Sequence, residues 1–177
     1  MLGPWWGGAV FLLDATKGLV ASLTPILTAP ASSFTSGGFG LGPALVPAAL
    51  AAGIASILGH MFSPFAGFKG GRGVATSLGV FLGVATYPTL LAFGVWVALF
   101  AASRRVSVGS IGAAAIYPLL LLWLAPVGPF RSWLVLAGIG IAALVVLRHI
   151  PNIKRLLQGT EPALIGGGTK PSEEPKS

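Results

Sequence analysis

A glycine-rich stretch with two cations, Gly67-Phe68-Lys69-Gly70-Gly71-Arg72-Gly73, is the part of this sequence best suited to chemistry. Glycines remove the side chains that keep a ligand away from the backbone, and consecutive N–H groups in such a turn can enclose an anion. The residues from Val74 onward predict a helix, whose N-terminus favours phosphate. Full positive charges nearby would strengthen binding, and an arginine can hold phosphate through two hydrogen bonds. The candidate phosphate ligands are Lys69, Gly70, Gly71, Arg72 and Gly73.

The same stretch also has a simpler interpretation. It can be a positively charged cytoplasmic turn between two membrane helices, in which the glycines only permit close packing. The residues of the stretch alone leave both interpretations open.

Composition limits the class of protein. Hydrophobic residues make up 54% of the chain and charged residues 8%, and the mean hydropathy is +0.87. A soluble domain carries roughly a quarter charged residues, so this chain is predicted to be an integral membrane protein. The net charge is +7, but the cations lie singly or in pairs at the ends of apolar segments, which is typical of membrane topology and not of nucleic-acid binding. The absence of cysteine and the scattered histidines and carboxylates predict neither a metal site nor another cofactor.

Apolar segments long enough to approach a membrane span recur along the chain. The predicted spans are Trp5–Leu27, Ala44–Met61, Val74–Thr86, Pro88–Ser103, Ile111–Leu124 and Ser132–Leu147. Tyr87-Pro88 divides the third from the fourth, because proline disfavours a continuous helix. The predicted fold is all-α, a polytopic membrane bundle of about six helices. Residues 1–158 form the membrane domain, and residues 159–177 are predicted to be a disordered cytoplasmic tail.

Six crossings place both termini on the same side of the membrane. Seven cations would lie on that side, namely Lys69, Arg72, Arg104, Arg105, Arg148, Lys154 and Arg155, whereas Arg131 alone lies on the other. The positive-inside rule makes the shared side cytoplasmic. The glycine-rich stretch, the junction at residues 104–110 and the segment with His149 and Asn152 then meet at one face. Three polar clusters on one face of an apolar bundle suggest a phosphorylated, partly lipidic substrate.

Other polar residues have two interpretations each. Asp14 and Lys17 share one helical face inside the first span, and a structural ion pair is favoured for Asp14, while Lys17 could also face a substrate. His60 is more simply a hydrogen-bonded interface residue. Ser107 or Ser110 could cap the following helix or bind a phosphate oxygen or a substrate alcohol.

Four segments in order resemble the PlsY family, the bacterial acyl-phosphate:glycerol-3-phosphate acyltransferases, from about Leu2 to Pro162. They are Asp14-Ala15-Thr16-Lys17-Gly18; Gly59-His60-Met61-Phe62-Ser63-Pro64 with Phe68-Lys69-Gly70-Gly71-Arg72-Gly73; Arg105-Val106-Ser107-Val108-Gly109-Ser110; and His149 with Asn152 followed by Gly159-Thr160-Glu161-Pro162. Each segment alone is weak evidence for the family, whereas the four in this order and at this spacing are strong evidence.

Two features depart from the family. Pro151 stands where members often have Glu, and the family's first motif, with its catalytic Ser and Arg, has no counterpart here. No catalytic residue is therefore assigned. We expect that Met1 was placed too far downstream in the reading frame, since the remaining spans keep the family pattern; a truncated paralogue is the alternative. The full-length family implies seven transmembrane helices.

The resemblance implies a reaction. An acyl group passes from acyl-phosphate to the sn-1 hydroxyl of glycerol-3-phosphate and gives lysophosphatidate, in the bacterial inner (plasma) membrane, with the active site facing the cytoplasm. The predicted partners are these two substrates and the lipid bilayer, with a monomeric protein. Lys69, Gly70, Gly71, Arg72 and Gly73 would bind a phosphate; Ser107 or Ser110 with His149 and Asn152 would hold the glycerol phosphate; Lys17 is a further candidate. The alternatives are a catalytically inactive membrane fragment and a small anion transporter.

Overall fold

The described chain is built entirely of helices. The computed structural model describes residues 4–30, 45–64, 67–68, 70–125 and 127–164. Its helices are α1 (Pro4–Leu27), α2 (Leu45–Met61), α3 (Val74–Val84), α4 (Thr86–Ser103), α5 (Val106–Leu124), α6 (Pro129–Arg148) and α7 (Ile150–Leu157). In these residues α1, α4, α5 and α6 are long and apolar enough to cross a membrane, and α2 and α3 are shorter apolar helices. The predicted all-α bundle of about six membrane helices is confirmed.

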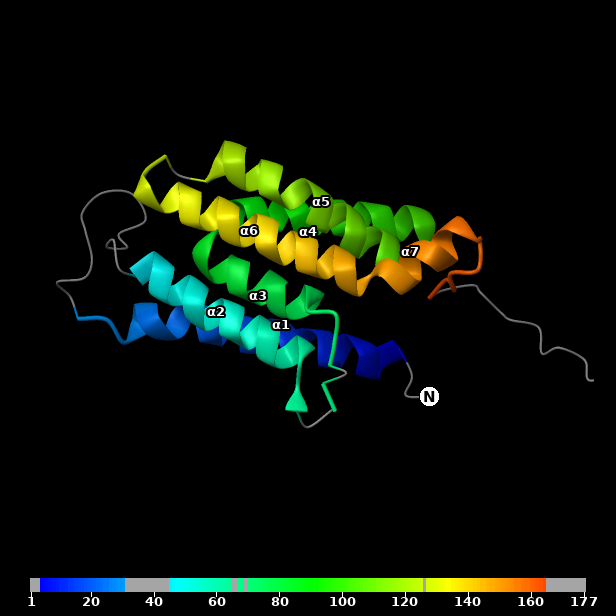
Figure 1. The fold of residues 1–177 in the computed structure, drawn as a ribbon, viewed down its shortest axis with the longest axis horizontal. Coiled ribbons are helices and arrows are strands. Elements are labelled where there is room, and N and C mark those ends of the chain that lie inside the picture. Colours follow the sequence, from blue (N-terminus) through cyan, green and yellow to red (C-terminus); the bar gives the residue numbers. More distant parts are fainter. Residues whose placement is uncertain (1–3, 31–44, 65–66, 69, 126, 165–177) are drawn as a thin grey trace, which may run out of the picture.

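Successive helices run in alternating directions along the long axis of the molecule (Figure 1). As a result, the start of α1, the connection from α2 to α3, the junction of α4 with α5 and the junction of α6 with α7 all lie at one end. The structure therefore brings together the glycine-rich stretch, the junction at residues 104–110 and the His149 segment, as the alternation of spans predicts. We call this end of the bundle the site end.

Two predicted boundaries were wrong, and one helix was not predicted. The break between α3 and α4 falls at Ala85, and Pro88 lies within the first turn of α4. A proline is tolerated there because first-turn N–H groups have no intrahelical partner. Helix α5 begins at Val106, not Ile111, and residues 150–157 form the short helix α7, which was not predicted.

Glycines allow the first three helices to pack with little space between them. A Cβ atom on Gly18 would overlap the carbonyl of Thr76, and one on Gly79 would overlap the carbonyl of Ala15. These two glycines therefore set the distance between α1 and α3, and small residues at such contacts are typical of membrane helix pairs.

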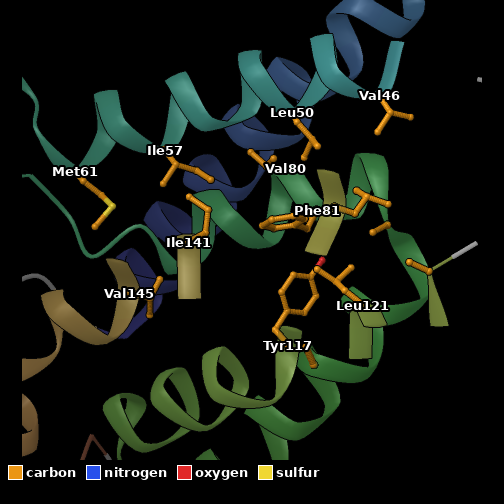
Figure 2. Packing of buried hydrophobic residues seen from close by; sticks show 14 residues of the cluster. Val46, Leu50, Ile57, Met61, Val80, Phe81, Tyr117, Leu121, Ile141 and Val145 are labelled. Atoms are coloured by element: carbon orange, nitrogen blue, oxygen red, sulfur yellow. The ribbon is translucent and has the colours of Figure 1, made fainter. Parts of the chain in front are cut away.

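The core lies where α2, α3, α5 and α6 meet (Figure 2). Phe81 of α3 is buried against Tyr117 of α5, whereas Val80 of α3 is buried against Gly53 of α2. The rings of Phe81 and Tyr117 pack edge to face with centroids 4.8 Å apart, an arrangement that adds to the gain from burial. This core holds α3, and with it the glycine-rich stretch at its N-terminus, in a fixed position.

Candidate functional site

Residues 62–73, which we call the glycine loop, connect α2 to α3 at the site end. The loop turns back on the end of α2: the Gly71 N–H donates to the His60 carbonyl at 3.2 Å. A Cβ atom on Gly70 would overlap that same carbonyl, and one on Gly71 would overlap the His60 ring. Gly73 has φ +79°, which favours glycine. The loop conformation therefore requires glycine at these positions. Lys69, the other predicted phosphate ligand, lies outside the described residues.

The N-terminus of α3 offers an anion N–H donors that have no hydrogen-bond partner in the described part of the chain. Its first N–H groups, at Val74, Ala75 and Thr76, have no intrahelical partner, and Gly73 at the N-cap has no side chain to bond them. The hydroxyls of Thr76 and Ser77 in the same turn are buried without a hydrogen-bond partner in the described residues. This end of α3 therefore has the features of a phosphate site, namely unpaired N–H groups and the positive end of a helix dipole.

Arg148, the last residue of α6, binds the glycine loop. Its Nη2 atom donates to the carbonyls of Met61 at 2.6 Å, Gly70 at 3.2 Å and Gly71 at 3.2 Å. Its guanidinium carbon also lies 5.3 Å from the centre of the Phe62 ring. In the sequence, Arg148 indicates only membrane topology, because a cation after an apolar span is expected there whatever it contacts.

Asp14, Lys17 and His60 form a polar cluster between α1 and the end of α2. The Nζ atom of Lys17 lies 2.9 Å from Oδ1 of Asp14 and 3.0 Å from Nδ1 of His60. Oδ1 of Asp14 lies 3.2 Å from the same His60 nitrogen. The predicted Asp14–Lys17 ion pair and the interface role of His60 are confirmed. A role for Lys17 as a substrate ligand stays a prediction.

Glu161 organises a second polar cluster where α5 meets α7. Its Oε1 accepts hydrogen bonds from the Ser107 hydroxyl at 2.6 Å and the Asn152 amide at 2.7 Å, and its Oε2 accepts from Arg155 at 2.7 Å. The Arg105 side chain donates to the Glu161 backbone carbonyl at 3.0 Å. Burial raises the pKa of the Glu161 carboxyl, but the hydrogen bonds from Ser107, Asn152 and Arg155 outweigh it and hold the pKa at about 2. Glu161 is therefore ionised at neutral pH.

This cluster corrects two sequence-based predictions. The predicted disordered tail starts at Gly159, yet Glu161 is buried and Leu164 donates its N–H to the Arg104 carbonyl at 2.9 Å. Residues 165–177 lie outside the described residues.

Neither Ser107 nor Ser110 caps α5, because Arg105 occupies the N-cap without a side-chain hydrogen bond. The Ser110 hydroxyl instead donates to the Val106 carbonyl at 2.9 Å and accepts from the Trp96 indole at 3.2 Å. Their roles as substrate ligands stay predictions.

His149, between α6 and α7, carries a buried nitrogen that has no hydrogen-bond partner among the described residues. The ring is 1% exposed, and its Nδ1 lies 2.8 Å from the Val145 carbonyl oxygen. A carbonyl only accepts, so Nδ1 holds the proton and Nε2 of the neutral ring is an acceptor. Burial lowers the pKa of His149, and the nearby charge of Arg72 lowers it further. The neutral ring therefore offers a free acceptor close to a cation of the glycine loop.

An apolar pocket of about 90 Å³ lies beside the α3 N-terminus, bounded by α1, α3, α4, α5 and α6. Val74 and Ser77, from the first turns of α3, line it nearest the glycine loop. Phe81, Thr89 and Tyr117 line it farther along the bundle, and the hydroxyls of Thr89 and Tyr117 bond each other at 2.9 Å. The pocket wall therefore presents few unpaired polar groups to an occupant.

Known proteins match this chain over most of its length. Residues 1–159 match the family model described as "Glycerol-3-phosphate acyltransferase". The glycerol-3-phosphate acyltransferase of Geobacter sulfurreducens is 41% identical over 160 residues, which are 90% of this chain and 73% of that protein. The enzyme of the same name from Thioalkalivibrio sulfidiphilus is 39% identical over 170 residues, 95% of this chain and 74% of that protein.

Two solved structures that resemble this chain come from the same family of enzymes as these relatives. The crystal structure of PlsY (YgiH), described as an integral membrane glycerol 3-phosphate acyltransferase in its glycerol 3-phosphate form, superposes with a TM-score of 0.74 at 37% identity, over 92% of this chain and 72% of that one. Its lysophosphatidic acid form gives 0.73 at 36% identity, over 91% of this chain and 74% of that one. Fold and sequence together define an integral membrane acyltransferase. The chain belongs to the glycerol-3-phosphate acyltransferase family, as the resemblance to PlsY implies.

Proposed function

We propose that the protein transfers an acyl group from acyl-phosphate to the sn-1 hydroxyl of glycerol-3-phosphate and releases lysophosphatidate and inorganic phosphate. One observation carries the choice of donor: the apolar pocket and the unpaired N–H groups meet at the first turn of α3. Acyl-phosphate has this combination of an alkyl chain and a phosphate head. Its chain would fill the pocket, and its head would lie at the helix N-terminus.

The acceptor binds on the other side of the same helix start. The glycine loop and Arg72 hold the phosphate of glycerol-3-phosphate, and the free Nε2 of His149 accepts a hydrogen bond from its glycerol hydroxyl. The closeness of Arg72 and His149 supports this pairing. Asn152, Ser107, Ser110 and Lys17 remain further candidates, the first two with their orientation fixed by Glu161.

In this proposal, the positioning of the two substrates accounts for most of the rate enhancement. The acceptor hydroxyl oxygen bonds to the acyl carbonyl carbon, the bond from that carbon to the phosphate oxygen breaks, and the hydroxyl proton leaves with the phosphate. Acyl-phosphate is a mixed anhydride with a good leaving group, so the protein needs no covalent intermediate. Holding both anions at one helix end, with dipoles directed at the developing charge, lowers the barrier.

The site end faces the cytoplasm of a bacterial inner membrane in this proposal. The support is the distribution of charge in the described residues: the cations at the site end are Arg72, Arg104, Arg105, Arg148, Lys154 and Arg155, while Arg131 lies at the start of α6 at the other end. Cytoplasmic segments carry such an excess of Lys and Arg. Both water-soluble glycerol-3-phosphate and the released phosphate would then exchange with the cytoplasm.

The decisive experiment is an acyl-transfer assay on purified protein in detergent or lipid. Palmitoyl phosphate, palmitoyl-CoA and palmitoyl-acyl carrier protein are each supplied with labelled glycerol-3-phosphate. We expect lysophosphatidate only with palmitoyl phosphate, with one phosphate released for each product. Transfer from the thioesters alone would overturn the choice of donor, and the absence of product from all three would overturn the proposed function.

Replacing Arg72 with alanine is expected to raise the KM for glycerol-3-phosphate roughly 10- to 100-fold, because a hydrogen bond to a charged group contributes about 1.5–3 kcal/mol. Lys154→Ala removes a cation of α7 that is also exposed and serves as the control. Steady-state kinetics over both substrates measures the effect. An Arg72→Ala protein that loses its fold, or that keeps a normal KM, would show that the loop is only structural.

The pH dependence of kcat/KM is expected to show the titration of the His149 ring. Its pKa lies below the ordinary 6.5, so the neutral acceptor form persists at pH 6.5 and is lost only as the pH falls further. Activity should therefore decline on acidification with a limb below pH 6.5 that His149→Gln lacks. The phosphate of the substrate titrates identically with both proteins, so the difference isolates the histidine. Identical profiles for the two proteins would exclude this role.

A further inference from the structure

We propose that Arg148 is a positioning residue, which fixes the backbone of the glycine loop in the conformation that binds phosphate. This inference rests on the proposed function of the same site. A residue of α6, a helix far from the loop in sequence, would then control the direction in which the N–H groups of the loop point.

In the described residues, the hydrogen bonds and the ring contact of the Arg148 side chain are with the loop and the end of α2. One guanidinium nitrogen, Nη2, reaches three carbonyl oxygens, of Met61, Gly70 and Gly71, within 2.6–3.2 Å. The guanidinium also lies over the Phe62 ring, at a distance typical of a cation–π contact. The three acceptors belong to the last residue of α2 and to two loop glycines, so a single side chain holds both sides of the turn.

No carboxylate competes for this guanidinium in the described part of the chain. The two acidic residues there, Asp14 and Glu161, pair with other groups: Asp14 with Lys17 and His60, and Glu161 with Arg155. The charge of Arg148 is therefore compensated by carbonyl dipoles of the loop. Charge-assisted hydrogen bonds of this kind are stronger than neutral ones, so they constrain the loop effectively.

The direction of the two glycine peptides follows from these bonds. In a planar trans peptide the carbonyl and the following N–H point in opposite directions. With the Gly70 carbonyl held by Arg148, the Gly71 N–H points the other way, and it bonds the His60 carbonyl at 3.2 Å. With the Gly71 carbonyl held in the same manner, the N–H of Arg72 points away from Arg148. Without the arginine, these peptides keep only the bond from the Gly71 N–H to His60 in the described residues. They would then reorient more readily, since glycine accepts either sign of φ.

Kinetics of Arg148→Met provides the first test. If the loop then holds the binding conformation for about one tenth of the time, the KM for glycerol-3-phosphate rises about tenfold, while kcat stays within about threefold of the wild type. Arg148→Lys keeps the charge and a donor and is expected to recover most of this loss. Arg104→Met is the matched control, because Arg104 is an exposed cation at the same end that makes no side-chain contact with the loop in the described residues.

Hydrogen exchange provides a second readout that does not depend on activity. In substrate-free protein, amide exchange across residues 70–73 is expected to be at least tenfold faster in Arg148→Met than in the wild type or Arg104→Met, because the loop opens more often. This result supports the inference even if the wild type transfers no acyl group, in which case only the proposed function fails. If Arg148→Met does not fold, Arg148→Gln, which removes the charge and shortens the side chain, takes its place in both measurements. Loop exchange and KM both unchanged in a folded Arg148→Met or Arg148→Gln protein would overturn the inference.

Discussion

Replacing Gly71 with alanine is expected to reduce kcat/KM for acyl transfer about 100-fold, the effect of displacing reacting groups by about 1 Å. The new Cβ would overlap Nε2 of the His60 ring and lie 2.6 Å from its Cε1. The ring cannot easily withdraw, because its Nδ1 lies within 3.2 Å of both Lys17 and Asp14. The loop must move instead, and with it the N–H groups at the start of α3.

Gly59→Ala is the matched control for this change. Gly59 is in the last turns of α2, close to the loop in sequence, and its Cβ would meet no atom within 4 Å. It should retain full activity, with a slight gain in helix stability. The double variant His60→Ala, Gly71→Ala removes the ring that causes the overlap and is expected to recover part of the lost activity. A Gly71→Ala enzyme within threefold of the wild type would contradict the proposed loop geometry.

Replacing Glu161 with alanine is expected to destabilise the protein by roughly 2–5 kcal/mol, because it leaves buried donors without an acceptor. Ser107 and Asn152 are 2% and 3% exposed, so water cannot replace the lost carboxylate without a rearrangement. Arg155 would lose its ion pair as well. Thermal unfolding in detergent at pH 7 measures the change, with Gln158→Ala, at an exposed position just after α7, as the control.

Glu161→Gln separates charge from hydrogen bonding in the same cluster. The glutamine amide keeps one acceptor oxygen, so the melting temperature of the Glu161→Gln protein should lie between those of the wild type and Glu161→Ala. The folded-state pKa of about 2 is below the ordinary 4.5, so the contribution of the carboxylate is complete above pH 4.5 and is lost as the pH falls toward 2. Only the wild type should lose this contribution on acidification. Equal melting temperatures for all three proteins would exclude a stabilising role for Glu161.

The sequence determined the class of fold and the place of the glycine loop because both depend on local properties. A membrane helix needs an apolar run and satisfies its own backbone hydrogen bonds, so hydropathy alone places most spans. The requirement for glycine at positions 70, 71 and 73 follows from the turn that the loop must make, and Asp14 and Lys17 pair because they lie three residues apart on one helix. Motifs in order then sufficed to identify the family.

Only the tertiary structure decided which side chains hold the site together. Arg148 bonds residues 87, 78 and 77 positions earlier in the chain, and the Ser107 hydroxyl bonds Glu161, 54 positions later. The hydropathy pattern shows that a cation ends a span and that a carboxylate begins a polar tail, but it contains nothing about the rotation of one helix against another. Partner choice depends on that rotation, which is set by the close packing of α1 with α3 and by the buried core around Phe81 and Tyr117.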